Sequence, residues 1–276
     1  MPGLGGTTLP FRHAPEDLRK TGVHDHASPR RMRQSPMPLI ALLPDIHANL
    51  AALTAVLDET GRLGAERIVC CGDIVGYGME PAACVRMLRE RGATSVLGNH
   101  EAMMLLAMRQ PSQVPSREAS RNNPVWNGIH RALEELDEGD VSWLASLPRV
   151  LEIPGAIVGH AALHGGEGWP YLLDSKHARL TLDLMKRQGH AIGFFGHTHW
   201  QEWFSLPGDP AREPRETSGF QLEEGVAYAV TTGSVGRPRG QNPDPTWTLW
   251  DSERKVFEFR SAKVPERSKN DPDRSA

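Results

Sequence analysis

The chain has 276 residues and a formal net charge of -3, with 39% hydrophobic and 24% charged residues. This composition is typical of an ordinary folded domain and gives no basic surface for nucleic acid or for an anionic membrane. No segment approaches the ~20 apolar residues of a membrane span. Three cysteines, two of them adjacent, do not suit a disulfide framework, and we therefore expect a cytoplasmic protein.

Residues 1–36 are rich in Pro, Gly, Arg and His and lack apolar periodicity, which predicts a disordered N-terminal extension. Arg30-Arg31 stands before an apolar run and imitates a twin-arginine export signal. That run is short, however, and it ends in Asp45, which the candidate site described below needs. We expect instead that Met37 or Met32 begins the folded protein.

From Leu39 onward, short apolar runs alternate with stretches of helical periodicity. The expected elements are a strand at 39–43, a helix from 50, a strand at 68–71, a helix at 81–91 and a strand at 94–97. This βαβαβ pattern predicts parallel strands, and ligands bind at the carboxyl ends of such strands.

The second half of the chain begins with helices and ends with strands. Helices are expected at 102–108, 125–136, 141–147 and 175–187, and strands at 149–153, 156–158, 191–195, 200–205, 225–232, 246–251 and 255–259. Parallel units early and antiparallel strands late predict an α/β fold, a four-layer αββα sandwich of two mixed β-sheets flanked by helices. We expect one domain over residues 37–261, followed by a charged, flexible tail at 262–276.

Side chains that can bind a metal ion through oxygen or nitrogen follow the ends of the predicted strands. In chain order they are Asp45, His47, Asp73, Asn99, His160, His197 and His199. Carboxylates, imidazoles and one amide, without a thiolate, suit Mn²⁺, Fe or Zn²⁺ in a catalytic pair better than a structural zinc or an iron–sulfur cluster. A single block such as Asp45-Ile46-His47 is a weak signal, but the whole ordered series predicts a two-metal hydrolase.

The single histidine between the third and the last of these blocks requires a choice between His160 and His164. His160 directly follows the apolar run 156–158, which matches the position of the other candidate ligands at strand ends. His164 stands before Gly165-Gly166 and is interpreted as a loop residue. We therefore predict that His160 belongs to the metal site.

The series D-x-H, GD, GNH, H and GHxH resembles that of the calcineurin-like metallophosphoesterases and is present in full. The segments 45–50, 72–78 and 233–239 look like the small bacterial YfcE-like phosphodiesterase branch. The resemblance implies two divalent ions, of Mn, Fe, Zn, Ni or Co, and a bridging hydroxide that attacks the phosphoryl group. It implies a first ion held by Asp45, His47, Asp73 and His199, and a second held by Asp73, Asn99, His160 and His197.

The same resemblance implies catalytic roles for two residues. Asp73 bridges the ions and brings the shared negative charge that lets two cations lie close together. His100 faces the leaving group and donates a proton or stabilises developing charge.

The loop after Asp73 has the sequence Gly76-Tyr77-Gly78. Phosphoprotein phosphatases and symmetrical diadenosine tetraphosphatases have Asp-Arg-Gly there. The aspartate that would orient His100 and an arginine that would grip phosphate are therefore missing. This difference favours diesters, because a monoester dianion benefits more from a bidentate guanidinium.

Four further residues are candidates for substrate binding. Arg237 and Arg239, on a Gly-rich loop after a predicted strand, are candidates for contact with phosphate. Trp169 and Tyr171, close after His160, are candidates for stacking on a base or an aryl leaving group.

The sequence thus favours a dinuclear phosphoesterase that hydrolyses phosphodiester or related phosphoryl bonds of a small molecule. One alternative is a phosphomonoesterase acting on proteins or nucleotides, with Arg237 or Arg239 replacing the missing arginine. Another is a catalytically silent binding module on the same fold. Retention of His100 together with every ligand speaks against the silent module, because a scaffold would be free to lose them.

Overall fold

The structure is a computed structural model that describes residues 38–165, 168–207, 219–239 and 243–265. All of these residues belong to one compact unit. The predicted extension at 1–36, the expected start at Met32 or Met37 and the tail beyond residue 265 lie outside the described residues. Within the described part of the chain, no helix has the length and apolar character to cross a membrane.

One of the two β-sheets has six strands in the order β3-β2-β1-β10-β11-β8. They are β3 (Thr94–Ser95), β2 (Arg67–Cys70), β1 (Leu39–Leu43), β10 (Thr246–Asp251), β11 (Val256–Ser261) and β8 (Phe220–Gln221). The first three are parallel, whereas β10, β11 and β8 pair antiparallel with their neighbours. The sheet is therefore mixed, with the βαβαβ unit on one side.

The second sheet has five strands in the order β4-β5-β6-β9-β7. They are β4 (Val150–Ile153), β5 (Ala156–Gly159), β6 (Ile192–Phe195), β9 (Ala227–Thr232) and β7 (Gln201–Leu206). Strands β5, β6 and β9 are parallel, and the edge strands β4 and β7 are antiparallel to their neighbours.

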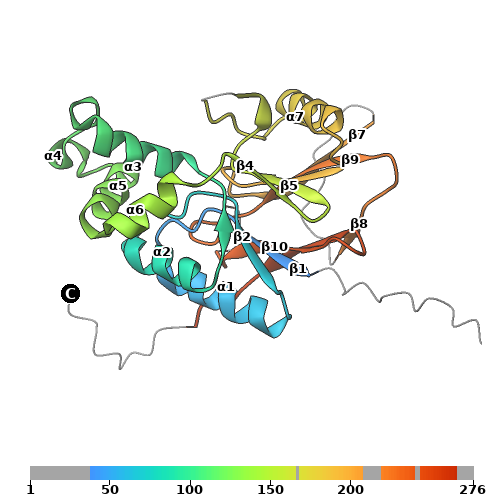
Figure 1. Cartoon of the computed structure of the whole chain (residues 1–276), viewed down its shortest axis with the longest axis horizontal. Coiled ribbons are helices and arrows are strands. Elements are labelled where there is room, and N and C mark those ends of the chain that lie inside the picture. The colour runs from blue at the N-terminus through green and yellow to red at the C-terminus, as the bar shows by residue number, and fades with distance from the viewer. Residues whose placement is uncertain (1–37, 166–167, 208–218, 240–242, 266–276) are drawn as a thin grey trace, which may run out of the picture. The chain divides into compact units, whose positions relative to one another are not determined.

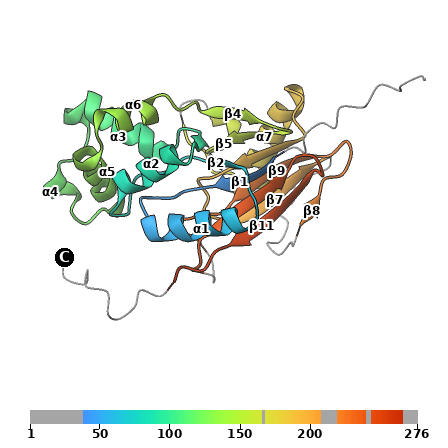
Figure 2. The same cartoon turned by 60° about the horizontal axis from the view of Figure 1, so that its bottom comes forward.

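Alternation of side chains along the strands separates the core into layers. In β1, Ile40 and Leu42 pack between the sheets, whereas Ala41 and Leu43 pack against helices. Aromatic rings fill the space between the sheets, and those of Phe194 and Trp250 lie 5.4 Å apart. Figures 1 and 2 show α1 and α7 on opposite sides of the paired sheets.

Helices cover both outer faces. The helices are α1 (Leu50–Arg62), α2 (Pro81–Glu90), α3 (Asn99–Arg109), α4 (Arg117–Ser120), α5 (Pro124–Glu135), α6 (Glu138–Ala145) and α7 (Ser175–Arg187), with short 3₁₀ turns at Pro111–Gln113 and Leu163–Gly165. Apolar residues of α1, α2, α3, α5 and α6 share one core with the outward face of the six-stranded sheet. Helix α7 packs on the outward face of the five-stranded sheet. Helices α3 to α6 gather beyond one end of the sheets (Figure 1).

The predicted αββα sandwich is confirmed. The strands at 39–43 and 246–251 and the helix at 175–187 agree with the prediction residue for residue. The predicted strand at 94–97 was too long, because only Thr94–Ser95 pair with β2 as a strand. β8 and α4 were not predicted, because they have two and four residues and are too short for a periodic signal. All three cysteines are buried and free, as expected.

Candidate metal centre

The seven predicted ligand residues and His100 follow the carboxyl ends of five strands. Asp45 and His47 come after β1, Asp73 after β2, Asn99 and His100 after β3, His160 after β5, and His197 and His199 after β6. Both sheets therefore contribute to one cluster. All of its carboxylates and imidazoles are buried, the most exposed being His197 at 8%.

Several of these residues have a left-handed backbone. The φ angles are 49° at Asp45, 49° at His47, 55° at Asp73, 67° at His197 and 62° at His199. Such angles are uncommon for residues other than glycine and cost free energy. Strain concentrated at a cluster of polar side chains points to a functional site.

The first group of ligand atoms comprises Asp45, His47 and His199. Nε2 of His47 lies 3.1 Å from Nε2 of His199, and Oδ1 of Asp45 lies 3.3 Å from the latter. Nδ1 of His47 donates to the carbonyl of Val75, and Nδ1 of His199 donates to the carbonyl of Arg237. In neutral rings both Nε2 atoms then carry lone pairs that face each other beside a carboxylate. A bound cation satisfies this arrangement, so the residues fit a metal ion.

The second group comprises Asp73, His160 and His197. Nε2 of His160 lies 2.9 Å from Oδ1 of Asn99 and 3.4 Å from Oδ2 of Asp73, while its Nδ1 donates to the carbonyl of Cys71. His197 contacts the carbonyl of Trp169 through Nε2, which leaves Nδ1 for an ion.

The structure places His160, rather than His164, in the cluster. His164 instead stacks on His177, with ring centroids 5.2 Å apart.

Asp73 lies between the two groups. Its Oδ2 is 3.4 Å from Nε2 of His160, 3.6 Å from that of His100 and 3.9 Å from that of His47. Its Oδ1 accepts a hydrogen bond from the backbone N–H of His100. The carboxylate thus lies next to imidazoles of both groups.

The buried imidazoles differ in proton affinity. Burial lowers the pKa of His47 to about 3 and that of His197 to about 4, so both rings are neutral near pH 7. Burial also opposes protonation of His160, but Asp73 outweighs it and raises the pKa of His160 to about 9. Burial favours the neutral form of Asp73, yet His160 and His100 hold its pKa well below the usual range. An ion held here would displace a proton from His160.

Glu101 is an important residue of the site that the sequence analysis did not select. Its buried carboxylate accepts hydrogen bonds from the backbone N–H groups of Asp73 and Gly98 at Oε2, and of Ile74 and Val75 at Oε1. Burial and the neighbouring Asp73 raise the pKa of Glu101 to about 7. The available signal was its place as the third residue of α3, where glutamate commonly reaches back to orphan N–H groups.

His100 faces the cluster without a partner for its second ring nitrogen. Its Nδ1 is buried and has no hydrogen-bond partner. Gly76 has a φ of 87°, and a Cβ there would overlap that nitrogen. The glycine therefore makes room for the ring, but it supplies no carboxylate to orient it. Burial lowers the pKa of His100 from its usual value.

The four predicted substrate residues lie around the cluster. Tyr171 stacks on His197 with centroids 3.9 Å apart, and Trp169 packs edge-on against His160 at 5.7 Å. Arg237 places its guanidinium carbon 4.2 Å from the centre of the Tyr77 ring. The backbone N–H of Arg239 donates to the carbonyl of His199, and its side chain is exposed.

The comparison with known proteins decides the family. Residues 38–201 match the family model described as calcineurin-like phosphoesterase. The uncharacterized protein MJ0912 of Methanocaldococcus jannaschii is 31% identical over 230 residues, which cover 82% of this chain and 87% of that protein. The chain belongs to the calcineurin-like phosphoesterase family.

This calcineurin-like phosphoesterase shares its fold with two solved structures. The metallophosphoesterase of Sphaerobacter thermophilus superposes with a TM-score of 0.66 at 24% identity and covers 82% of this chain and 89% of its own. The hypothetical protein PH1004 of Pyrococcus horikoshii superposes with a TM-score of 0.62 at 16% identity, covering 83% and 89%. Family membership makes the chain a metal-dependent phosphoric ester hydrolase, as predicted.

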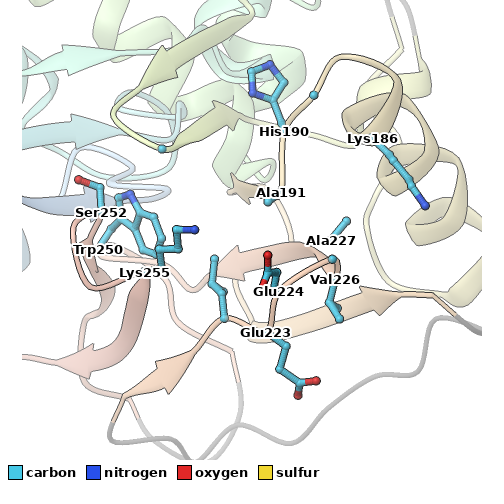
Figure 3. Close-up of a pocket in the computed structure, with 14 residues that line it drawn as sticks. Lys186, His190, Ala191, Glu223, Glu224, Val226, Ala227, Trp250, Ser252 and Lys255 are labelled. Atoms are coloured by element: carbon cyan, nitrogen blue, oxygen red, sulfur yellow. The ribbon is translucent and has the colours of Figure 1, made fainter.

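A cavity of about 560 Å³ lies away from the cluster of this phosphoesterase. It is lined by residues at the amino ends of β5, β6 and β9 and by the turn after β10, whereas the cluster lies at the carboxyl ends of parallel strands. Figure 3 shows Trp250 and Lys255 on one side of it and Val226 and Ala227 on the other. None of the predicted site residues lines this cavity.

Proposed function

We propose that this phosphoesterase binds two divalent ions and hydrolyses a phosphodiester or a related phosphoryl bond of a small molecule. The observation that carries the proposal is the pair of ligand groups with Asp73 between them. A single ion would leave one of these groups of ligand atoms without a cation.

The proposed ligands divide between the two ions. Those of the first are Asp45, His47, Asp73 and His199, and those of the second are Asp73, Asn99, His160 and His197. When bound, such ions supply positive charge that acidifies a water molecule and polarises a phosphoryl group. The protein orients the ligands beforehand, because backbone carbonyls hold the Nδ1–H groups of three histidines.

His100 is the proposed partner of the leaving group. Its Nε2 is 3.6 Å from Oδ2 of Asp73, so the ring edge reaches the centre of the cluster. Burial keeps the ring neutral near pH 7 by lowering its pKa. A neutral imidazole that holds its proton on Nε2 can donate it toward the departing oxygen.

A preference for diesters follows from the loop after Asp73. Gly76 and Tyr77 provide neither the aspartate nor the arginine that relatives with Asp-Arg-Gly have in this loop. A monoester dianion would lack that guanidinium, whereas a diester carries one charge fewer and needs it less.

The test compares bis-p-nitrophenyl phosphate with p-nitrophenyl phosphate, using protein reconstituted separately with Mn²⁺, Ni²⁺, Fe²⁺ and Zn²⁺. We expect two ions per chain by elemental analysis and a higher kcat/KM for the diester. A preference for the monoester would favour the phosphomonoesterase alternative. Absence of turnover with two ions bound would contradict the proposal.

A further inference from the structure

The loop of residues 233–239 is tied to the strand-end segment that carries Asp45. The backbone N–H groups of Val235 and Gly236 donate to the carbonyls of Pro44 and Asp45, at 2.8 and 2.9 Å. The hydroxyl of Ser234 donates to the same carbonyl of Asp45. These bonds fix the loop against the metal centre before any substrate arrives.

Both the backbone N–H and the backbone carbonyl of Arg237 form hydrogen bonds. Its N–H donates to the hydroxyl of Ser234, and its carbonyl accepts the Nδ1–H of His199. The start of the side chain is therefore fixed beside a proposed metal ligand. The direction of the guanidinium then depends on the side-chain torsion angles alone.

The guanidinium lies on an aromatic platform. The guanidinium carbon of Arg237 is 4.2 Å from the centre of the Tyr77 ring, a cation–π geometry. The Tyr77 ring meets His47 edge-on, with centroids 4.7 Å apart, and its centroid is 5.0 Å from that of His100. Tyr77 thus links the guanidinium to the rings of His47 and His100 at the rim of the centre.

No carboxylate neutralises this guanidinium within the described residues. None of their carboxylate oxygens lies within 4.0 Å of its nitrogens, and the side chain of Arg237 is exposed. Arg86 and Arg89, by contrast, both pair with the buried Asp140. A guanidinium that is held in place and has no carboxylate partner can donate two parallel N–H hydrogen bonds to an incoming anion.

We propose that Arg237, seated on Tyr77, binds a second phosphate group of the substrate, one carried by the leaving group. This inference rests on the proposed function, in which His100 faces the leaving group. Arg237 lies at the rim and does not reach the carboxylates of the cluster, so it is too far out to bind the phosphoryl group that reacts there. It can instead contact a part of the leaving group that extends from the scissile bond past Tyr77. The substrate class is therefore a phosphoester whose leaving group is itself phosphorylated.

The test measures binding by calorimetry to the metal-loaded chain and needs no turnover. The probes are propyl phosphate with propane-1,3-diol bisphosphate, and butyl phosphate with butane-1,4-diol bisphosphate. One phosphate of each probe mimics the group at the ions, and the second phosphate of a bisphosphate reaches the rim. We expect at least one bisphosphate to bind the parent protein about 10- to 100-fold more tightly than its matched monophosphate.

Variants test which residue makes the bisphosphate bind more tightly than its matched monophosphate. Arg237→Gln should abolish the advantage, and Tyr77→Leu should reduce it while Tyr77→Phe retains it, because phenylalanine keeps the platform. The matched control is Arg62→Gln on α1, whose guanidinium contacts only the carbonyl of Asp58 among the described residues. The control should keep the parental advantage.

Three results would overturn the inference. The parent could bind both members of each pair equally, or Arg237→Gln could keep the full advantage. Equal weakening of both members by Arg237→Gln would instead place this residue at the ion-bound phosphate. The proposed function fails by a different observation, absence of diester turnover with two ions bound, so the two failures are distinguishable.

Discussion

Three histidines of the cluster have one ring nitrogen committed before an ion arrives. His47, His160 and His199 donate Nδ1–H to backbone carbonyls, at 3.2, 2.8 and 2.8 Å. In the neutral form of each ring the tautomer is thereby fixed, with the Nε2 lone pair facing the centre; His160 reaches this form when it loses its second proton. The orientation of each of these histidines thus depends on a hydrogen bond to a backbone carbonyl of a residue outside the ligand motif.

Replacing His100 separates metal binding from catalysis. His100→Ala should keep the full metal content and lower kcat by about 10²- to 10⁴-fold, because only the donor to the leaving group is lost. Elemental analysis and diester turnover measure the two effects. His190→Ala is the control, since His190 lies before β6 at the far end of the strand from His197. A variant as active as the parent would show that His100 has no such role.

Replacing Glu101 tests how the loops of the centre are held. Glu101→Gln presents an NH₂ group where a carboxylate oxygen accepts two backbone N–H bonds, so at least one buried donor loses its partner. We expect the metal-free protein to lose about 1–3 kcal/mol of unfolding free energy, measured by chemical denaturation. Glu90→Gln, at the exposed end of α2, should change little. Equal stability of the two variants would refute the assigned role.

At the scale of elements, helix α5 packs closely against the loop of Gly76 and Tyr77, which borders His100. Gly128 of α5 faces this loop, and a Cβ at position 128 would overlap the backbone N of Tyr77. Gly76 of the same loop in turn borders the ring of His100. The helix therefore limits where the loop can lie, and through the loop it limits the space around the ring of His100.

The contact between α5 and the loop predicts that Gly→Ala at position 128 lowers the unfolding free energy, whereas the same substitution elsewhere in a helix usually raises it. Gly→Ala inside a helix ordinarily stabilises by up to about 1 kcal/mol. Gly61→Ala in α1 should follow this rule, because nothing beyond its own helix and chain neighbours lies within 4 Å of the place that a Cβ would take. Gly128→Ala should instead destabilise by about 1–3 kcal/mol and lower kcat as the loop shifts against His100. Unfolding free energies and diester turnover of both variants check this contrast.

At the scale of the whole molecule, the metal centre is divided between the two sheets. The six-stranded sheet delivers Asp45, His47, Asp73 and Asn99, and the five-stranded sheet delivers His160, His197 and His199. Two of the three candidate ligand groups draw on both sheets, since His199 joins Asp45 and His160 joins Asp73. The third group, His47, Asp73 and His100, follows strands of the six-stranded sheet alone. Assembly of the sandwich and formation of the centre are therefore linked.

This division predicts that metal ions stabilise the whole fold. An ion that binds only the folded state at 100 times its Kd adds about 2.7 kcal/mol to the unfolding free energy. Added Mn²⁺ should therefore shift the denaturation midpoint upward in the parent and in Asp58→Asn, which is exposed on α1. Asp73→Asn should lose most of its metal, nearly all activity and this shift. A shift of equal size in Asp73→Asn would contradict the bridging position.

Much of this architecture is encoded locally. Apolar runs and helical spacing predicted the order of the major strands and helices, because both patterns depend on residues close together in the chain. The parallel order of β1, β2 and β3 then placed Asp45, Asp73 and Asn99 at one edge. The sequence alone thus determined the fold class, the family resemblance and the list of candidate ligands.

Tertiary structure decided how those ligands are used. Which ring nitrogen faces the centre depends on contacts such as that between His199 and Arg237, and the facing pair of His47 and His199 is separated by 152 positions. The bonds of Glu101 to the loop of Asp73 and the seat of Arg237 on Tyr77 also join distant segments. Side-chain direction in irregular loops follows from packing and hydrogen bonding across the fold, which no local pattern records.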